Sequence, residues 1–220
     1  MRFLDRVDAG LALARALDVH RSPDAVVLAI PRGGVVVGAQ VAHHLGARLE
    51  VVVACKVQAP GHPELGMGAV AEGDVRHLDL GLAGVLNVAP GELRGAVRDA
   101  EDEVRRRVMA YRQGRHLPDL RGRVAFLVDD GIARGVTARA AIEAVKKLGL
   151  ARLVVAAPVA SAFAADSLAA LADAVVTLAR PAVLRSVSEW YEDFAPLRDL
   201  DVVAWLGTAG GRAGGEHAVA

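Results

Sequence analysis

The sequence of 220 residues has one cysteine, three lysines, few aromatic residues and no net charge, and these shortages exclude several classes of protein. A single cysteine, Cys55, allows neither an internal disulfide nor a cysteine-based metal site, which favours the cytoplasm. With 26 basic and 26 acidic residues, the overall charge attracts neither nucleic acid nor an anionic membrane. No apolar run reaches the roughly 18 residues of a membrane-spanning helix, and the first residues are charged where a signal peptide is apolar. We therefore expect a cytoplasmic protein without nucleic-acid or membrane partners.

What the sequence does contain is an alternation of short apolar runs with segments of helical spacing. Hydrophobic residues make up 53% of the chain and are mostly Ala, Val and Leu, a composition that favours an α/β core over an aromatic-rich β-sandwich. Strands that alternate with helices predict a parallel sheet covered on both faces, and the length suits one well-buried domain. The expected strands are 25–30, 49–55, 124–128, 152–157 and 174–179, and the expected helices are 5–17, 35–45, 92–112, 138–148 and 161–172.

Two segments lack a regular pattern. Residues 57–74 are rich in Gly and Pro and have no helical period, which predicts a long mobile loop followed by a weak hairpin. Residues 207–220 are rich in Gly and Ala, and we expect a disordered tail there.

The helix expected at 92–112 has a narrow apolar stripe and many charges. Its acids stand four residues before its bases, in the pairs Glu101 with Arg105, Asp102 with Arg106 and Glu103 with Arg107. Because these acids neutralise the three consecutive arginines, a solvated helix face is a better interpretation than a nucleic-acid site.

The stretch 123–137 carries the strongest functional signal. An apolar run ends in Asp129 and Asp130, and a loop bracketed by Gly131 and Gly135 then leads into a helix. A turn of this kind directs free backbone N–H groups and a helix N-terminus at one point, which suits a phosphate. Because carboxylates repel phosphate, the acid pair must face sugar hydroxyls, a divalent cation or a developing positive charge.

Two further polar groups follow expected strands. Arg32, Gly33 and Gly34 follow the first strand, and Lys56 follows the second. In an open parallel sheet, ligands bind beyond the carboxyl ends of the strands, so these groups should meet the acid pair. Taken alone, the glycine pair could be only a tight turn, and Lys56 only a solvated cation.

These residues resemble a known family. Residues 124–137 resemble the phosphoribosyl-diphosphate (PRPP) binding motif of type I phosphoribosyltransferases, which is an apolar strand, two acids, a four-residue turn, then Gly and a final Thr or Ser. More narrowly, Pro31-Arg-Gly-Gly, Lys56-Val with its Pro-Gly-x-Pro-Glu loop, and Trp190-Tyr-Glu-Asp-Phe resemble a bacterial subgroup whose acceptor is unassigned.

The resemblance implies a doubly wound, parallel-sheet α/β core in a single domain at 1–206, with a flexible lid loop at about 57–78 and a small C-terminal hood at about 181–206. It implies that Asp129 and Asp130 face the ribose hydroxyls of PRPP and its Mg²⁺, and stabilise charge as C1 becomes oxocarbenium-like. The leaving pyrophosphate would bind Arg32, Gly33, Gly34 and Lys56, and the 5′-phosphate would bind Gly131, Ile132, Ala133, Arg134, Gly135, Val136 and Thr137.

Two positions depart from the family pattern. Arg134 stands where the family usually has Thr, and it either replaces the hydroxyl with a charge contact or fills the pocket. Ala133 stands where 6-oxopurine salvage enzymes carry an acid, which disfavours hypoxanthine and guanine as acceptors. On the acceptor side, Trp190, Tyr191 and Phe194 lie where the family has its hood, and a planar base could stack there.

Three functions remain open from the sequence. The first is an enzyme that transfers the 5-phosphoribosyl group of PRPP to a nitrogenous, base-like acceptor with release of pyrophosphate. The second is a PRPP- or nucleotide-binding regulatory module without catalysis, and the third is a generic phosphate-binding α/β domain. We also expect a homodimer.

Overall fold

The computed structural model describes residues 2–210, which fold around two β-sheets. The larger sheet has five parallel strands in the order β2-β1-β6-β7-β8. Its strands are β1 (Val26–Ala29), β2 (Arg48–Val51), β6 (Val124–Val128), β7 (Arg152–Val159) and β8 (Ala174–Ala179). The fold class expected from the sequence is therefore confirmed.

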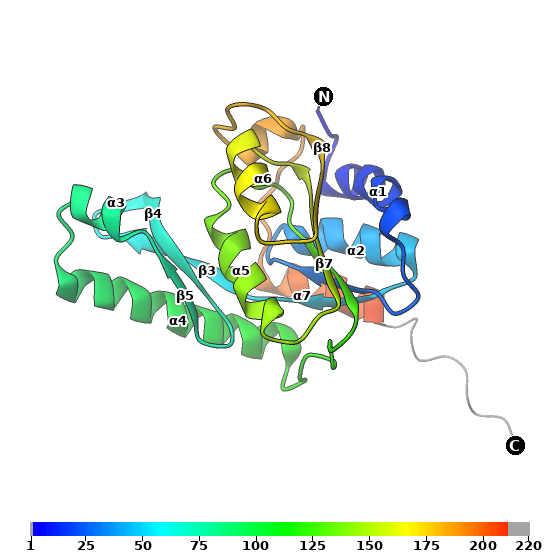
Figure 1. Cartoon of the computed structure of the whole chain (residues 1–220), viewed down its shortest axis with the longest axis horizontal. Helices are drawn as coiled ribbons and strands as arrows, with labels where there is room; N and C mark the ends of the chain where they lie inside the picture. The colour runs from blue at the N-terminus through cyan, green and yellow to red at the C-terminus, as the bar shows by residue number, and fades with distance from the viewer. Residues whose placement is uncertain (1, 211–220) are drawn as a thin grey trace, which may run out of the picture.

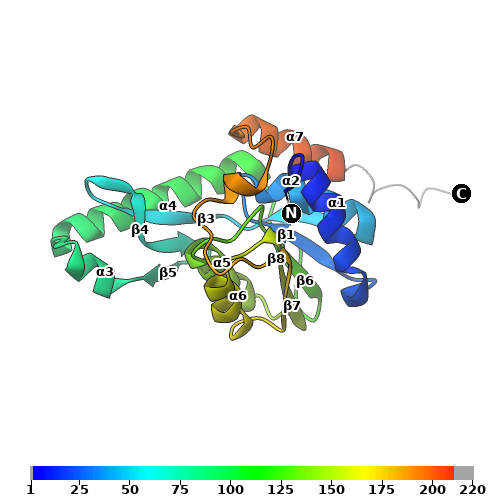
Figure 2. The ribbon, with the colours of Figure 1, turned by 90° about the horizontal axis from the view of Figure 1, so that it is seen from above.

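Helices cover both faces of this sheet (Figures 1 and 2). On one face lie α1 (Arg6–Ala16), α2 (Gly34–Leu45) and α7 (Asp199–Gly210), and on the other lie α5 (Val136–Lys146) and α6 (Ala162–Ala169). Alternate residues of each strand face opposite cores, as Phe126 and Leu127 of β6 do. This two-sided burial explains why the strands read as continuous apolar runs rather than as an alternating pattern.

The expected strand 49–55 is wrong as a single element. The chain leaves the parallel sheet after Val51, and residues from Ala54 onward form β3 (Ala54–Ala59) of the second sheet. Buried polar groups stabilise the break, because Arg112 Nη2 donates to Val51 O at 2.7 Å and Val53 N donates to Glu72 Oε1 at 2.9 Å. A run of apolar β-branched residues hides this break, since every one of them is buried on either side of it.

In residues 57–74 the expected long mobile loop is wrong, although the hairpin that was expected after it is present. The lid expected at about 57–78 falls in the same segment. Most of it belongs to an antiparallel sheet of β3, β4 (His62–Ala71) and β5 (Val75–Leu78), with a two-residue connection at Pro60 and Gly61. Side chains of β3 alternate, so that Val57 is buried whereas Lys56 and Gln58 are exposed. The glycines that suggested a loop instead permit close packing, because a Cβ at Gly68 would lie 2.3 Å from the His77 carbonyl oxygen.

A long helix, α4 (Pro90–Arg112), packs along this second sheet and forms with it and the short α3 (Leu80–Val85) an arm that projects from the core (Figure 1). The predicted apolar stripe is confirmed at Val97, Ala100 and Val104. The predicted charge pairs are confirmed only for Glu103 with Arg107. Arg105 and Arg106 instead pair with acids three residues earlier, and Glu101 pairs with Arg76 of β5.

The C-terminal region contains a helix that the sequence interpretation missed. Helix α7 extends to Gly210, so residues 207–210, expected to be a disordered tail, are helical, and residues 211–220 lie outside the described part. Val202 and Leu206 bury this helix against α2 and α4. The expected hood at 181–206 therefore consists of a largely irregular segment with a short 3-10 turn (Val187–Trp190), followed by α7. Of the residues 2–210, no helix is long and apolar enough to cross a membrane.

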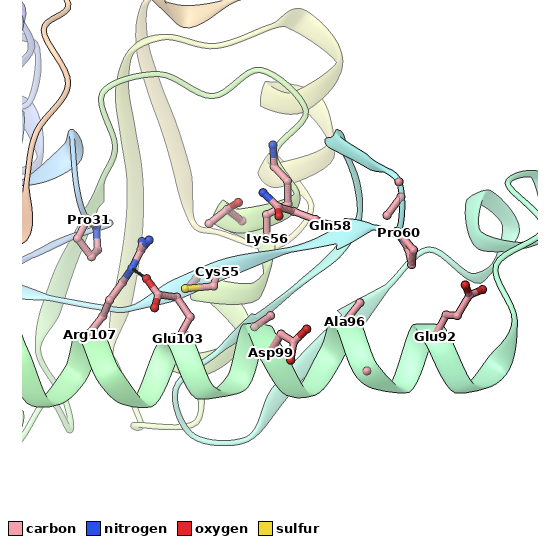
Figure 3. A pocket seen from close by; sticks show the side chains of 16 residues that line it. Pro31, Cys55, Lys56, Gln58, Pro60, Glu92, Ala96, Asp99, Glu103 and Arg107 are labelled. Atoms are coloured by element: carbon pink, nitrogen blue, oxygen red, sulfur yellow. Dashed lines mark hydrogen bonds and ion pairs between the residues drawn. The ribbon is translucent and has the colours of Figure 1, made fainter.

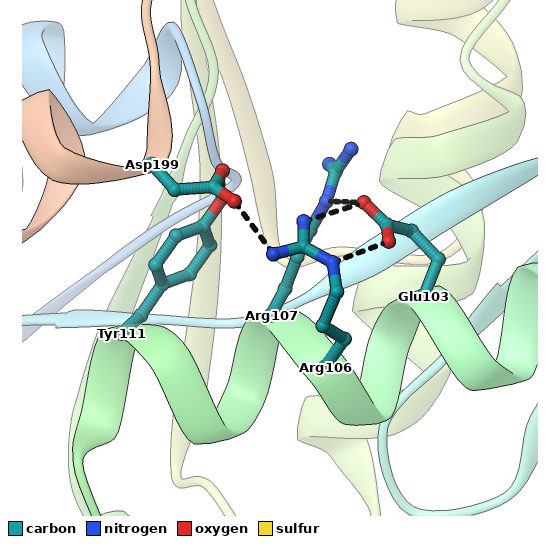
Figure 4. Close-up of polar contacts among 5 residues, drawn as sticks. All are labelled: Glu103, Arg106, Arg107, Tyr111 and Asp199. Atoms are coloured by element: carbon teal, nitrogen blue, oxygen red, sulfur yellow. Dashed lines mark hydrogen bonds and ion pairs between the residues drawn. The ribbon is translucent and has the colours of Figure 1, made fainter.

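Charged residues join α4 to α7 (Figure 4). Arg106 binds both Glu103 and Asp199, Arg107 binds Glu103, and Tyr111 Oη donates to Asp199 Oδ1 at 2.6 Å. The hydrogen bond from Arg106 is the main cause that lowers the pKa of Glu103 to about 2. A carboxylate with a depressed pKa stabilises the folded state at neutral pH and loses this contribution as the pH falls towards that value.

We predict that Glu103→Gln lowers Tm at pH 7 and that the difference from the wild type narrows between about pH 4.5 and pH 2, because both proteins then carry a neutral group. Calorimetric melting across this pH range would measure the effect. Asp102→Asn is a matched control on the same helix, since Asp102 pairs with the exposed Arg105 and its loss should change Tm little. A pH-independent difference for Glu103→Gln would contradict the assignment.

Candidate active site

The loop between β6 and α5 is fixed by the neighbouring strand and helix. Ile132 N donates to Val159 O at 2.9 Å, and Ser161 Oγ donates to Ala133 O at 2.6 Å. Gly135 has a φ of 75°, a conformation that glycine adopts without strain, and it immediately precedes α5. No side chain caps this helix start, in contrast to α1 and α6, which Asp5 and Ser161 cap. The first N–H groups of α5 are therefore available to an anion.

The acid pair lies at the start of this loop and is largely buried. Asp129 Oδ1 accepts a hydrogen bond from Asp130 N at 2.9 Å, and Asp130 Oδ2 accepts one from Arg6 Nε at 2.7 Å. Burial raises the pKa of Asp129, and the neighbouring Asp130 carboxylate raises it further. Burial also raises the pKa of Asp130, but there the arginine opposes the effect.

The glycine turn after β1 packs directly against the acid pair. A Cβ at Gly33 would lie 1.7 Å from Asp130 Oδ2, and one at Gly34 would lie 2.7 Å from Val128 O and 2.9 Å from Asp129 Cα. Only glycine fits at both positions. The preceding peptide bond, Pro31–Arg32, is cis, and the Arg32 side chain is exposed. The structure thus brings together the glycine turn and the acid pair, as expected.

Lys56 reaches the same region by a different route from the expected one. It lies inside the antiparallel strand β3 and not at the end of a parallel strand, yet it lines one cavity of about 820 Å³ together with Pro31 and Thr137. In Figure 3, Lys56 and Gln58 project from one side of β3, whereas Cys55 points from the other side towards α4. Burial raises the pKa of the Cys55 thiol, so this cysteine is an unreactive wall residue at neutral pH.

The remaining wall of the cavity comes from α4. Its polar lining includes Glu92, Asp99, Glu103 and Arg107, and Figure 3 shows Arg107 extending from the helix towards Pro31 with Glu103 beside it. The sequence interpretation treated this charged helix as solvated and missed its contribution. The spacing pattern reveals the charges of this helix. It does not reveal that the helix packs against β3, because that contact joins segments distant in the sequence.

The expected acceptor aromatics do not form one stacking surface. Tyr191 is buried between Phe3 and Phe194, with ring centroids 5.5 and 4.9 Å away, and its hydroxyl donates to Asp130 O at 2.5 Å. Trp190 and Phe194 are half-buried in the same small cluster. All three lie beside the acid turn and outside the lining of the 820 Å³ cavity.

The described residues contain no group of three or more His, Cys, Asp or Glu side chains that could hold a metal ion. Asp129 and Asp130 could supply only part of an octahedral Mg²⁺ shell, and substrate oxygens and water would have to supply the rest. This donor set suits a cation that arrives with a diphosphate and not one that the protein retains by itself.

Comparisons with known proteins agree with this geometry. Residues 5–175 match the family model described as the phosphoribosyl transferase domain. The chain belongs to this family. A Mycobacterium tuberculosis protein, found in two strains, is 39% identical to this chain over 207 residues. Its provisional name is phosphoribosyl transferase. The match covers 94% of this chain and 47% of the relative, so the chain spans about half of that protein's length.

A solved structure has the same fold. The protein TT1426 from Thermus thermophilus superposes with a TM-score of 0.78 at 41% identity, covering 96% of this chain and all of that one. The resemblance seen in the sequence is therefore confirmed at the level of family and fold.

We predict that Gly33→Ala destabilises the protein by about 1–3 kcal/mol, because the new methyl group would displace the Asp130 carboxylate. The backbone is not the cause, since φ at Gly33 is −60°. Urea unfolding would measure the change. Gly84→Ala in α3 is a matched control because nothing lies near its Cβ, and it should be neutral or slightly stabilising. Equal unfolding midpoints for wild type and Gly33→Ala would refute the close approach.

Proposed function

We propose that this domain transfers the 5-phosphoribosyl group of PRPP to a nitrogenous, base-like acceptor and releases pyrophosphate. The observation that carries the proposal is the single cavity shared by Thr137 of α5, Pro31 of the glycine turn and Lys56 of β3. These residues belong to the three elements expected to hold the 5′-phosphate and the pyrophosphate.

The two ends of PRPP would bind to different elements of this site. The uncapped start of α5, with the backbone N–H groups of residues 131–137 and the Thr137 hydroxyl, suits the 5′-phosphate. Arg32, Lys56 and the amides of Gly33 and Gly34 suit the pyrophosphate. Asp129 and Asp130 stand beside the glycine turn, where the ribose would connect the two ends.

The chemistry follows from this arrangement. The bond from C1 to the pyrophosphate oxygen breaks as a nitrogen lone pair of the acceptor attacks C1, and the electron pair of the broken bond leaves on the pyrophosphate. Cationic Arg32 and Lys56 would stabilise that leaving group, and the carboxylates of the acid pair would stabilise positive charge at C1. A Mg²⁺ ion bound with PRPP would neutralise further phosphate charge.

Water must be kept from C1, since hydrolysis would compete with transfer. The β3–β4 hairpin and α4 already enclose the cavity on two sides. We therefore propose that the hairpin, and not an irregular loop, acts as the lid, with its tip at Pro60 and Gly61 closing over the substrate.

For the acceptor, the half-buried ring of Trp190 offers apolar surface for a planar base, whereas Phe194 is in contact with Tyr191 and with the Arg6 guanidinium. The polar α4 wall of the cavity offers hydrogen-bonding groups to the rest of such a molecule. Ala133 disfavours the 6-oxopurines because it supplies no acid. A cytoplasmic location and a homodimer belong to the same proposal, and light scattering would test the second.

The first experiment is a thermal-shift titration with PRPP and Mg²⁺, because a ligand at about 100 times its Kd stabilises the folded state by roughly 2.7 kcal/mol. Absence of a shift would exclude PRPP binding. Pyrophosphate release across a panel of nitrogenous bases would then separate the enzyme from its alternative, a PRPP- or nucleotide-binding regulatory module that shifts in Tm but never turns over.

We predict that Lys56→Ala and Asp130→Asn each reduce turnover by about 100-fold or more while the fold persists, because each removes a charge that faces the transition state. Pyrophosphate release measures turnover, and circular dichroism checks the fold. Lys146→Ala is the matched control, since Lys146 lies at the far end of α5 and donates to the Leu171 carbonyl. Wild-type rates in both site variants would place the chemistry elsewhere.

Arg134 is exposed in the loop between β6 and α5, which favours a charge contact to the phosphate over obstruction of its site. We therefore predict that Arg134→Thr weakens PRPP binding by about threefold to tenfold, because an exposed charge contact to a phosphate is lost. Calorimetric titration at two salt concentrations would measure this, and the loss should shrink at high salt. Tighter binding by Arg134→Thr would instead identify the arginine as an obstruction.

A further inference from the structure

Arg6 contacts the acid pair although it is distant from it in the sequence. It lies in the first turn of α1, 124 positions before Asp130, and its Nε donates to Asp130 Oδ2 at 2.7 Å. The two side chains are 11% and 14% exposed. Because removing one partner of such a buried pair leaves a charge without compensation, breaking this contact is more costly than breaking an ordinary surface ion pair.

The guanidinium of Arg6 is itself held in place. Its central carbon lies 3.7 Å from the centroid of the Phe194 ring, and Nη1 donates to Ala195 O at 3.0 Å. One planar group thus makes an ion pair, a backbone hydrogen bond and a cation–π contact. A lysine ammonium could not satisfy all three directions, so the geometry is specific for arginine.

Two further parts of the chain lie close to Asp130, one at the carboxylate and one at the backbone carbonyl. Its Oδ2 lies where a Gly33 side chain would begin, and the Asp130 carbonyl accepts a hydrogen bond from Tyr191 Oη. Arg6, Gly33 and Tyr191 come from α1, the glycine turn and the C-terminal segment respectively. They restrain this one residue from three parts of the chain.

We propose that Arg6 is a positioning residue, which fixes the orientation of the Asp130 carboxylate so that it can bind the ribose of PRPP. This inference rests on the proposed function and adds to it a residue outside every motif of the site. A carboxylate that is already oriented loses less rotational freedom on binding, and hydroxyl recognition depends strongly on such alignment. Without Arg6, Asp130 would be free to rotate towards solvent or to approach Asp129.

The test compares Arg6→Gln, Arg6→Lys and Arg2→Gln by calorimetric titration with Mg²⁺ and PRPP, together with Tm and a kcat against KM analysis of pyrophosphate release. Arg2 is the matched control because it donates to the Tyr191 carbonyl, and so supports the same N-terminal segment, without touching Asp130. We expect Arg6→Gln to weaken PRPP binding by about tenfold or more, Arg6→Lys to recover part of this loss, and Arg2→Gln to stay within about twofold of the wild type.

Several outcomes would contradict the inference or the function on which it rests. PRPP affinity in Arg6→Gln within about twofold of the wild type would show that the orientation of Asp130 does not matter. An equal loss in Arg2→Gln would show that Arg6 acts only by holding the N-terminal segment. Failure of the wild type itself to bind PRPP would refute the proposed function. This result differs from the other two, in which the wild type binds PRPP. Should Arg6→Gln not fold, Arg6→Lys decides alone, since it keeps the charge but not the geometry, and unchanged affinity refutes the inference.

Discussion

The adjacency of β1 and β6 at the centre of the parallel sheet is the constraint on which the site depends. Ile30 N donates to Val128 O at 2.8 Å, so the two strands are still paired where both turn away from the sheet. The turns that follow must therefore share the same small space. Glycine at 33 and 34 is the consequence, because any side chain there would occupy the volume of the acid pair or its backbone.

Two neighbouring carboxylates in this confined space are costly to ionise, and polar groups from other parts of the fold offset this cost. Burial raises the pKa of both acids, and the neighbouring Asp130 carboxylate raises the pKa of Asp129 further. At Asp130, Arg6 of α1 binds the carboxylate, and the hydroxyl of Tyr191 in the C-terminal segment donates to the backbone carbonyl. An N-terminal and a C-terminal segment thus meet at the acid turn, where Phe3 N also donates to Trp190 O at 2.8 Å.

The arm of β3, β4, β5 and α4 gives the site its cationic and enclosing side. Lys56 reaches the cavity only because β3 leaves the parallel sheet and the alternation of the new strand turns this residue outward. Along the same cavity, Arg107 of α4 is paired with Glu103, whereas Lys56 of β3 is exposed and has no carboxylate partner among the described side chains of residues 2–210. This difference favours Lys56 over Arg107 as the partner of a pyrophosphate.

The sequence could predict those elements of the fold that contiguous residues determine. The strand, the acid pair, the glycine-bracketed loop and the helix at 124–146 are contiguous, and propensity, turn chemistry and helix geometry all agree there. Lys56 was expected at this cavity through a wrong argument, since the strand before it ends five residues earlier, at Val51. Its apolar neighbours are buried on both sides of the break, and burial alone does not tell one sheet from another.

Arg6 marks the limit of such reasoning. In the sequence of α1, Arg6 is one charged residue among several. It contacts Asp130, 124 positions later, only because the fold brings α1 and the acid turn together. Helix α7 was missed for a related reason. Its first residues were assigned to the hood and residues 207–210 to a tail, because burial of Val202 and Leu206, which stabilises the helix, depends on the tertiary fold. Residues that bind a ligand must satisfy local geometry and leave a pattern in the sequence. Residues that orient them need only the right position in the finished fold, so they are found where the structure leaves a buried charge that must have a partner.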